Sequence, residues 1–540
     1  MRTFSSYGPV DIEINYYAPR KELLDFGYRQ LVGPNPEKGG HYITVWGSRQ
    51  TGKSWALREI LFRLKKDEKY HVLKINLENL KQTKDVCIIL EHLSESIGSG
   101  LNKTIPVVNT PEKFQNIFSC KVLDKPLVLI LDEFDALNED AISAIVSTFR
   151  NIYTIRQDQS DRPTDKKDYL LHAVALIGVR SVLGVESAKG SPFNVQRSMQ
   201  IPSLTFDEVE TMFRWHEQES GQRVDQEVID TLFYEIQGQP GLTCWFGELL
   251  TQGWGQFRVT PAMPMDMALF ERAYRAGLYR LPNNNILNII SKVKVTPYKE
   301  IVLRLLGTRE KVAFAYDKID LNFLYTNGVI DIEEIDDHNQ KELYAKFACP
   351  FVQKRLFNFL TDELFDIGDE LYEPFEDIES AINETRIDVR QMMKFYQKYL
   401  IKNSHWILER APRRSDLRIF EAVFHFNVYM YLSRFIRRYG GEVYPEFPTG
   451  NGQIDLVLKY AEKTYGVELK SYIDRAEYRK ALKQSAAYGQ QLGLKEISLI
   501  FFIEYIDADN KIKFETDFND PDTGVKVRPV FVETKSLNDL

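Results

Sequence analysis

The chain has 540 residues, of which 44% are hydrophobic, 27% charged and 12% aromatic. This composition supplies enough apolar side chain for several cores and excludes a disordered or fibrous protein. The length predicts about three to four domains, at ~150 residues each. With 69 basic and 77 acidic residues the formal net charge is −8, which does not indicate a nucleic-acid binder, although a total can hide a local patch.

The cysteines and the start of the chain bear on its compartment. The four cysteines are too few for a disulfide framework and too widely spaced for a local zinc knuckle, so we expect reduced thiols in the core. The first residues form no apolar leader with basic flanks, and no run approaches the ~18 apolar residues of a membrane span. We therefore expect a cytoplasmic protein without a membrane partner.

The first part of the chain alternates strand and helix patterns. Residues 1–40 are rich in proline and glycine and predict a lead-in with one helix at 20–31. Residues 41–205 alternate short apolar runs with amphipathic stretches, which predicts a parallel sheet covered by helices on both faces. The polar stretch 157–167 predicts an exposed loop. The predicted strands are 42–46, 72–75, 128–131 and 173–177, and one predicted helix is 55–64.

The remainder divides into four further segments. Residues 206–280 have helical spacing and predict a helical subdomain. Residues 281–360 predict a winged helix, because a helical pattern precedes a short apolar hairpin. Residues 361–410 predict an acidic helical connector, and residues 411–540 predict a second α/β unit.

The local charge reverses between the connector and the C-terminal unit. Residues 361–390 hold eleven acidic and two basic side chains, a local net of −9, and residues 401–440 hold eight basic and three acidic ones, a local net of +5. One hypothesis is that the acidic segment mimics nucleic acid and covers a catalytic site. The basic side chains either follow a phosphate backbone or form a solvated helix face, which is the better interpretation of each one alone. The six that flank the helix are Arg413, Arg414, Arg418, Arg434, Arg437 and Arg438.

A GxxxxGK[ST] pattern lies between a predicted strand and a predicted helix, the context that a phosphate-binding loop needs. Its glycines let backbone N–H groups turn toward a phosphate, and the helix N-terminus adds the positive end of its dipole. We expect Lys53 to neutralise the β- and γ-phosphates of ATP and the Ser54 hydroxyl to bind Mg²⁺. The expected nucleotide-binding residues of this loop are Gly47, Ser48, Arg49, Gln50, Thr51, Gly52, Lys53 and Ser54.

A second apolar strand, at 127–131, ends in two carboxylates. We expect Asp132 to hold the Mg²⁺ shell and to bind the nucleotide through it. We expect Glu133 to orient and deprotonate a water, which favours hydrolysis over transfer. Because the loop, its flanking elements and the carboxylate strand agree, a chance match to one short motif is the weaker interpretation.

These features resemble AAA-like ATPases of the signalling and defence type over roughly residues 5–360. The resemblance implies that Arg180 reads the γ-phosphate, with an ordinary surface arginine as an even alternative. It also implies that residues 238–242 are the glycine-proline turn of a lid that contacts the nucleotide, and that the winged helix packs with this lid. No arginine finger is identifiable, so a homo-oligomer remains an open alternative.

The C-terminal unit holds a second candidate site. Asp455 starts one apolar strand and Glu468 ends the next, so a hairpin would bring both carboxylates to one edge. Two oxygen ligands suit Mg²⁺, or Mn²⁺ in its place. Because strand side chains alternate, Glu468 and Lys470 face the same side. The ammonium could then orient the attacking water or stabilise charge on a phosphodiester.

These residues resemble the PD-(D/E)XK nucleases over residues 415–505. The resemblance implies that Glu421, on a preceding helix, completes the metal site, and that Gln484 and Tyr488 form the QxxxY motif of the RecB-like branch. Isoleucine instead of proline precedes Asp455, a departure that many members tolerate. Taken singly, each residue is better explained as part of an ordinary strand pair or helix face. Taken together they favour the nuclease, with a binding domain whose site is inactive as the main alternative.

The expected fold is a multidomain α/β protein, with a P-loop ATPase core, a helical lid and a winged helix before a restriction-endonuclease-like domain. The expected function is an ATP-gated, Mg²⁺-dependent nuclease of nucleic acid. DNA is favoured because the two families together suggest defence against foreign DNA. One alternative is a nucleotide-switched sensor that binds nucleic acid without cleaving it, and another is a remodelling motor.

Overall fold

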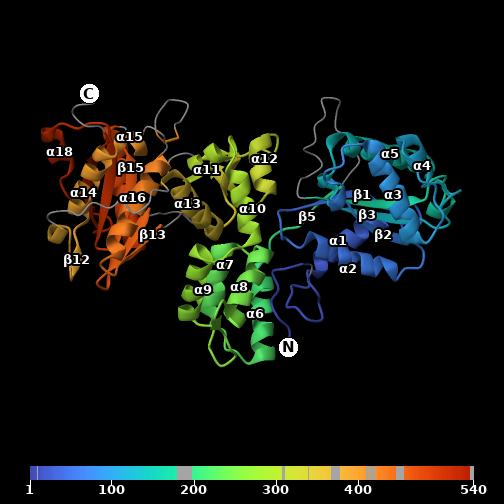
Figure 1. Cartoon of the computed structure of the whole chain (residues 1–540), viewed down its shortest axis with the longest axis horizontal. Coiled ribbons are helices and arrows are strands. Elements are labelled where there is room, and N and C mark those ends of the chain that lie inside the picture. Colours follow the sequence, from blue (N-terminus) through green and yellow to red (C-terminus); the bar gives the residue numbers. More distant parts are fainter. Residues whose placement is uncertain are drawn as a thin grey trace. The chain divides into compact units, whose positions relative to one another are not determined.

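The computed structural model describes residues 1–8, 10–178, 197–306, 311–337, 340–365, 378–408, 411–412, 419, 421–445, 455–472 and 474–534. The chain divides into two compact units, whose elements are labelled in Figure 1. The first unit comprises Met1–Ile289 and Phe314–Glu334, and the second comprises Ile290–Ala313 and Ile335–Leu540.

A five-stranded parallel sheet forms the centre of the first unit, in the order β2-β3-β4-β1-β5. β3 and β4 are buried along their whole length, and apolar clusters cover both faces of the sheet, which explains the continuous Val, Ile and Leu runs. The predicted parallel sheet is therefore confirmed. Its strands are β1 (Tyr42–Trp46), β2 (His71–Asn76), β3 (Leu127–Asp132), β4 (Leu171–Gly178) and β5 (Arg197–Gln200).

Helices cover both faces of this sheet (Figure 1). Side-chain caps begin three of them: Asp85 caps α3, Thr110 caps α4 and Asn138 caps α5. Such caps satisfy N–H groups that the helix itself leaves unpaired. The helices are α1 (Lys21–Val32), α2 (Lys53–Lys65), α3 (Val86–Leu101), α4 (Pro111–Asn116) and α5 (Glu139–Asp158).

The stretch 157–167, predicted to be an exposed loop, is partly buried. Thr164 and Lys167 are only 6% and 3% exposed. Lys167 donates a 2.7 Å hydrogen bond to the Arg156 carbonyl, and Arg156 donates one of 2.7 Å to the Thr164 hydroxyl. The prediction holds for most of the stretch, whose other residues are exposed or half-buried, but not for Thr164 and Lys167, whose polar groups find partners inside the fold.

His172 on β4 belongs to the same buried network. The Thr164 hydroxyl, which accepts from Arg156, donates to Nδ1 of His172 at 2.9 Å, and Nε2–H of His172 donates to the Val32 carbonyl at 3.1 Å. This arrangement holds a neutral imidazole. Burial lowers the pKa of His172 from 6.5 to about 3.

We expect the free energy of unfolding to fall as the pH drops below about 6.5, because unfolded His172 binds a proton that the folded protein excludes until the pH nears 3. Lowering the pH from 7.5 to 5.0 should cost ~2 kcal/mol from this group. Urea unfolding measures this loss, and His172→Gln should remove it, whereas His92→Gln on α3 should not. Equal pH dependence in the wild type and His172→Gln contradicts the prediction.

Four helices form the helical subdomain expected at 206–280. A capping box begins α6, which fixes its first turn. The start of the chain packs on these helices: Phe4 is buried, and its ring centroid lies 4.9 Å from that of Phe213 on α6. Gly247 on α8 permits this packing, because a Cβ there would lie 2.3 Å from the Phe4 ring. The helices are α6 (Phe206–Ser220), α7 (Gln226–Ile236), α8 (Pro240–Gln252) and α9 (Met267–Tyr279).

In its described residues, the range 281–360 expected to form a winged helix contains three helices and three strands, and a fourth helix, α13, begins at its end. The strands form a small sheet in the order β8-β10-β9, and β8 pairs antiparallel with β10. α12 belongs to the first unit and β10 to the second, so a winged helix stays a prediction. The elements are α10 (Asn284–Val293), α11 (Tyr298–Leu306), β8 (Val312–Ala313), α12 (Ile319–Thr326), β9 (Ile330–Asp337) and β10 (Gln340–Phe347), followed by α13 (Pro350–Phe365).

A six-stranded mixed sheet forms the centre of the second unit, in the order β13-β14-β15-β16-β18-β17. β13, β14 and β15 are antiparallel, whereas β15, β16 and β18 are parallel. The helix α14 (Val389–Lys402), within the predicted connector, packs against β18. Residues 366–377, which hold six of the eleven acidic side chains of the predicted acidic cover, lie outside the described residues.

The order helix, three strands, helix, strand follows the predicted order, and α18, β17 and β18 extend it. The helices are α16 (Glu421–Arg437), α17 (Arg475–Gln491) and α18 (Ala508–Phe514). The strands are β13 (Glu442–Pro445), β14 (Leu456–Tyr460), β15 (Lys463–Ser471), β16 (Glu496–Ile503), β17 (Phe518–Asn519) and β18 (Lys526–Glu533).

All four cysteines are free thiols, but only two are in the core. Cys244 and Cys349 are buried, whereas Cys87 and Cys120 are exposed. The prediction of core thiols is wrong for these two, because Cys87 lies in the first turn of α3 and Cys120 lies in a turn after α4. Within the described ranges, no helix is both long enough and apolar enough to cross a bilayer.

Candidate functional site

The loop after β1 has the backbone conformation that a phosphate-binding loop needs. Gln50 and Gly52 have φ angles of 59° and 92°. Gly52 is the N-cap of α2 and provides no side-chain cap, and the first turn of α2 holds no acidic residue. The first N–H groups of α2 thus remain available for an anion. The Thr51 hydroxyl braces the loop by donating to the Ser48 carbonyl at 2.9 Å.

Lys53 lies inside this loop. Its ammonium donates to the carbonyls of Gly47 and Ser48, both at 2.8 Å, and forms no ion pair with any described residue. Burial lowers the pKa of Lys53 to about 8, although Glu133 opposes this shift. A half-buried cation whose hydrogen-bond acceptors are both neutral favours an anionic ligand, so the loop fits the phosphates of a nucleotide.

Asp132 and Glu133 lie where β3 ends. Asp132 is 3% exposed, its Oδ1 accepts the Glu133 N–H at 3.1 Å, and its Oδ2 lies 2.6 Å from Nζ of Lys74 on β2. Glu133 has a φ of 55°, the left-handed backbone that functional sites use for non-glycine residues at a cost in strain. Burial and the nearby Asp135 raise the pKa of Glu133, which suits a group that must accept a proton near neutral pH.

The turn at 238–242 contacts the phosphate loop. Gln239 Nε2 donates to the Arg49 carbonyl at 3.0 Å, and the Gly241 N–H donates to the Gln50 carbonyl at 3.1 Å. A Cβ at Gly241 would lie 2.7 Å from Cβ of Gln50, so glycine permits the approach. The helical subdomain therefore touches the loop expected to hold the nucleotide. Arg180, the expected sensor, lies outside the described residues.

The second candidate site is on β15. Glu468 and Lys470 are 1% and 5% exposed, and Nζ of Lys470 lies 2.7 Å from Oε1 of Glu468. Asp455 precedes β14, and its Oδ2 accepts the Leu469 N–H at 2.5 Å. Burial and Asp455 together raise the pKa of Glu468, while Lys470 opposes the shift. The other oxygen of Glu468, Oε2, has no hydrogen-bond partner among the described residues.

Sequence analysis missed one residue of this cluster, His425 on α16. Its Nε2 lies 3.7 Å from Oε1 of Glu421, and its Nδ1 lies 3.8 Å from Oδ1 of Asp455. The side chain is buried, at 5% exposed. The spacing of four residues from Glu421 was the available signal, because residues four apart share one helix face.

The two helix residues expected to form a QxxxY motif also meet. Gln484 Nε2 donates a hydrogen bond to the Tyr488 hydroxyl. Burial raises the pKa of Tyr488, and the charge of Glu468 adds to this effect. The phenol therefore lies within electrostatic reach of the β15 carboxylate. The structure places Glu421, Asp455, Glu468, Lys470 and Tyr488 in one cluster, with Gln484 bonded to it through Tyr488.

The donor set of this cluster fits a hard divalent cation. Carboxylate oxygens are the ligands that Mg²⁺ and Mn²⁺ prefer, and the unpartnered Glu468 Oε2 leaves one buried acceptor unsatisfied. Among the described residues, no group of three or more His, Cys, Asp or Glu side chains is arranged to hold a metal. Mg²⁺ binds through one or two carboxylates and keeps several waters, so such a group is not required.

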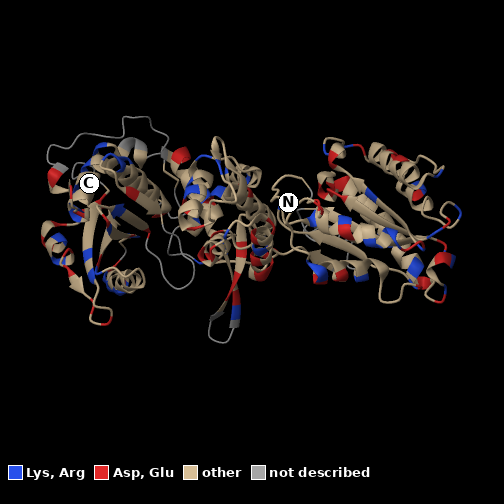
Figure 2. Ribbon diagram, turned by 90° about the horizontal axis from the view of Figure 1, so that it is seen from below, with Lys and Arg blue, Asp and Glu red and all other residues tan. Residues whose placement is uncertain are grey.

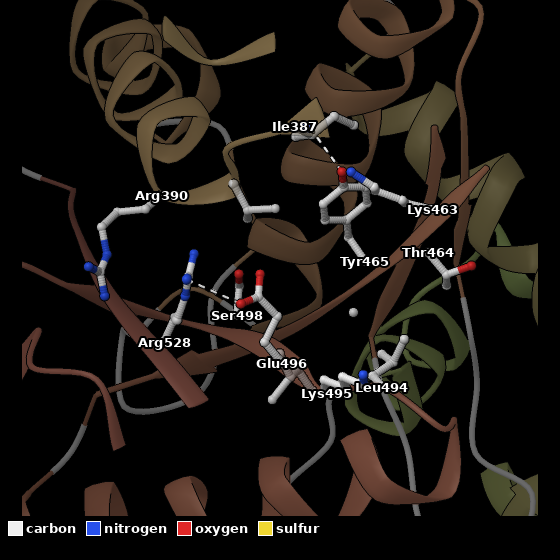
Figure 3. Close-up of a pocket in the computed structure, with 13 residues that line it drawn as sticks. Ile387, Arg390, Lys463, Thr464, Tyr465, Leu494, Lys495, Glu496, Ser498 and Arg528 are labelled. Atoms are coloured by element: carbon white, nitrogen blue, oxygen red, sulfur yellow. Dashed lines mark hydrogen bonds and ion pairs between the residues drawn. The ribbon is translucent and has the colours of Figure 1, made fainter. Parts of the chain in front are cut away.

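A cavity of about 340 Å³ lies elsewhere on the same sheet (Figure 3). It is lined by the first residues of β15 and β16 and by Arg390 and Arg528. Both guanidinium groups already have acidic partners: Arg390 lies 2.7 Å from Asp517, and Arg528 lies 3.2 Å from Glu496. The charge of these two arginines is therefore compensated, whereas Lys463 and Lys495, which also line the cavity, form no ion pair with a described residue.

Three comparisons place this chain among known proteins. The family model described as "AAA-like domain" matches residues 6–347, which is more than half of the chain. No curated protein matches.

Three solved structures are similar at low identity. The Walker-type ATPase PABY2304 of Pyrococcus abyssi is 14% identical, with 65% of this chain and 99% of that chain covered and a TM-score of 0.44. The ORC1 protein of Aeropyrum pernix, in complex with DNA, is 14% identical, with coverages of 63% and 92% and a TM-score of 0.32. Cdc6p of Pyrobaculum aerophilum is 16% identical, with coverages of 66% and 98% and a TM-score of 0.31. Because these TM-scores are low, the assignment of the chain to a family depends only on its match to the family model.

Proposed function

We propose that this chain, which belongs to the AAA-like domain family, is an ATPase whose nucleotide state controls a metal-dependent nuclease in its second unit. The ATPase part follows from the family and from the loop around Lys53. The nuclease part is supported above all by one observation, the buried Glu468–Lys470 pair beside Asp455.

In the ATPase, the residues of the first unit have separate tasks. The N–H groups at the start of α2 and the Lys53 ammonium would bind the phosphates. Ser54 and Asp132 would hold Mg²⁺, which supplies charge neutralisation at the phosphates when bound. Glu133, whose pKa is raised by burial, would accept a proton from the attacking water. Arg180 remains a candidate for reading the γ-phosphate.

In the nuclease, one or two of the carboxylates of Glu421, Asp455 and Glu468 would hold Mg²⁺ or Mn²⁺ directly, and the remaining groups, with His425, would contact its bound waters. When bound, the ion supplies Lewis-acid polarisation of the phosphodiester. Lys470 would orient the attacking water or stabilise negative charge on the phosphate, since its ammonium is fixed by Glu468. Gln484 and Tyr488 would position the nucleic-acid strand beside this cluster.

Nucleic acid as the substrate is supported by free positive charge on α17. Arg479, Lys480 and Lys483 are exposed and make no ion pair with any described residue. Lys480 lies one turn before Gln484, so it is the neighbour of Gln484 on the helix face. Elsewhere, basic and acidic residues are interspersed along the ribbon of each unit (Figure 2). A run of cations without acidic partners, next to the cluster of Asp455, Glu468 and Lys470, therefore supports binding of a polyanion. DNA is proposed because the two families together suggest defence against foreign DNA.

We expect Lys480→Gln/Lys483→Gln to weaken DNA binding uniformly across sequences. Because each phosphate contact contributes ~0.7–0.9 to the slope of log affinity against log salt, the double variant should lower that slope by about 1.4–1.8. Fluorescence anisotropy with labelled DNA in EDTA, at several salt concentrations, measures this without cleavage. The matched control is Lys394→Gln/Lys398→Gln, two exposed lysines of α14. Equal slopes for the two double variants contradict the prediction.

A plasmid-nicking assay tests the proposed function as a whole. The full chain, with Mg²⁺ or Mn²⁺ and with or without ATP, should nick supercoiled DNA, and the rate should depend on the nucleotide. DNA binding without cleavage under any of these conditions would instead favour the nucleotide-switched sensor. In that case the cations of α17 would still bind DNA, but Glu468 would have no catalytic role. Native mass measured with and without ATP tests a ring-forming motor, which is the third candidate.

A further inference from the structure

Both carboxylate oxygens of Asp132 are engaged in the structure. Oδ1 accepts the N–H of Glu133, and Oδ2 lies 2.6 Å from Nζ of Lys74. Asp132 is the residue expected to hold the Mg²⁺ shell of the nucleotide. A lysine ammonium therefore occupies the oxygen that a divalent cation at this site would need.

The sheet register explains why Lys74 reaches this oxygen. On β2, Lys74 is opposite Ile130, and Asn76 is opposite Asp132. Side chains two apart on a strand lie on the same face, so Lys74 shares the face of Ile130 and Asp132. Ile130 belongs to the cluster that contains the α2 residues Leu57 and Ile60, so this is the face covered by α2, the helix that begins with Lys53.

The two partners differ in their freedom to move. The side chain of Asp132 is 5% exposed and is held in place by the Glu133 N–H, whereas the side chain of Lys74 is 27% exposed. A long lysine side chain at a partly open position can swing its ammonium into water while its stem stays packed. Lys74 is thus the partner that can leave without disturbing β3.

We propose that Lys74 is a built-in competitor for the Mg²⁺ of the nucleotide. In the nucleotide-free protein its ammonium neutralises Asp132 and keeps this carboxylate aimed toward α2. Binding of Mg²⁺ with ATP releases the ammonium to solvent. Lys74 is a positioning residue that sets how much Mg²⁺ the site requires, and this inference rests on the ATPase part of the proposed function, not on the nuclease.

The competition predicts a specific change in Lys74→Met. Without the ammonium, Mg²⁺ no longer displaces a charged hydrogen bond, so the Mg²⁺ concentration for half-maximal ATP binding should fall about tenfold. Without Mg²⁺, ATP binding should weaken modestly, because one positive charge near the phosphates is lost. The ratio of the dissociation constants in EDTA and in Mg²⁺ should therefore rise about tenfold or more.

Calorimetric titration of the full chain with ATP, in EDTA and at a series of Mg²⁺ concentrations, measures this ratio. Lys74→Arg should keep the wild-type ratio, and so should Lys69→Met, which removes an exposed lysine paired with Glu37 at 3.0 Å. When Lys74→Met is added to Asp132→Asn, the ratio of the two dissociation constants should not change further. Such a double-mutant cycle would show that Lys74 acts through Asp132.

Two results would overturn the inference. If Lys74→Met weakens binding equally with and without Mg²⁺, the ion pair has a structural role only. If Lys74→Met instead needs a higher Mg²⁺ concentration for half-maximal ATP binding, Lys74 assists binding of the ion and does not compete with it. Failure of the wild type to bind ATP under any condition would instead refute the ATPase itself, so the two failures are distinguishable.

Discussion

Lys53→Ala is expected to abolish ATP hydrolysis. The ammonium is the half-buried cation of the phosphate loop, and its hydrogen bonds go to the carbonyls of Gly47 and Ser48. Removing a charge that stabilises the transferred phosphoryl group costs ~10²–10³ in rate. Because the same charge binds the ground-state phosphates, the affinity for ATP should fall as well. A phosphate-release assay and ATP titration measure the two losses.

Glu133→Gln is the informative partner of this variant. The amide keeps the shape and exposure of Glu133 but cannot accept the proton, so hydrolysis should fall by ~10²–10⁴ while ATP binding is retained. Glu139→Gln, on the exposed start of α5, is the matched control and should leave both unchanged. Hydrolysis at the wild-type rate in either Lys53→Ala or Glu133→Gln would refute the assignment of this site.

Glu468→Gln is expected to abolish nucleic-acid cleavage and to leave ATP hydrolysis intact. The amide keeps the size of the carboxylate and can still accept a hydrogen bond from Lys470, but it supplies no charge to a divalent cation. The expected loss is ~10² or more, measured on a supercoiled plasmid. The matched control is Glu496→Gln on the neighbouring strand β16, whose carboxylate is exposed.

The same substitution should change how the stability of the protein depends on pH. Burial raises the pKa of Glu468, so the ionised form is costly to hold in the fold. This cost lowers the free energy of unfolding of the wild type. The reduction grows as the pH rises above the ordinary pKa of a glutamate and is largest at alkaline pH. Between pH 7 and pH 9 in EDTA, the free energy of unfolding should therefore fall less in Glu468→Gln than in the wild type. The variant should be less stable overall, because the buried Lys470 ammonium loses its carboxylate partner. An equal fall with pH in both proteins would contradict the buried, ionisable role of Glu468, and full cleavage would refute the nuclease site.

The two candidate sites were predictable from sequence to different degrees. The phosphate loop is contiguous, so residues 47–54, the preceding strand and the following helix could be read together. The carboxylates Asp132 and Glu133 were predictable because an apolar run ends in them. The nuclease-like residues were predictable one by one, but their meeting depends on the hairpin of β14 and β15 and on the packing of α16 and α17.

The parallel sheet, the phosphate loop and the position of the carboxylates at strand ends could all be predicted from the amino-acid sequence. These follow from local periodicity and from residues that are neighbours in the chain. Only the tertiary structure decided that Lys74 pairs with Asp132, that Gln239 holds the Arg49 carbonyl and that His425 lies between Glu421 and Asp455. The reason is physical: such contacts depend on strand register and on helix packing between segments far apart in the chain, which local patterns do not encode.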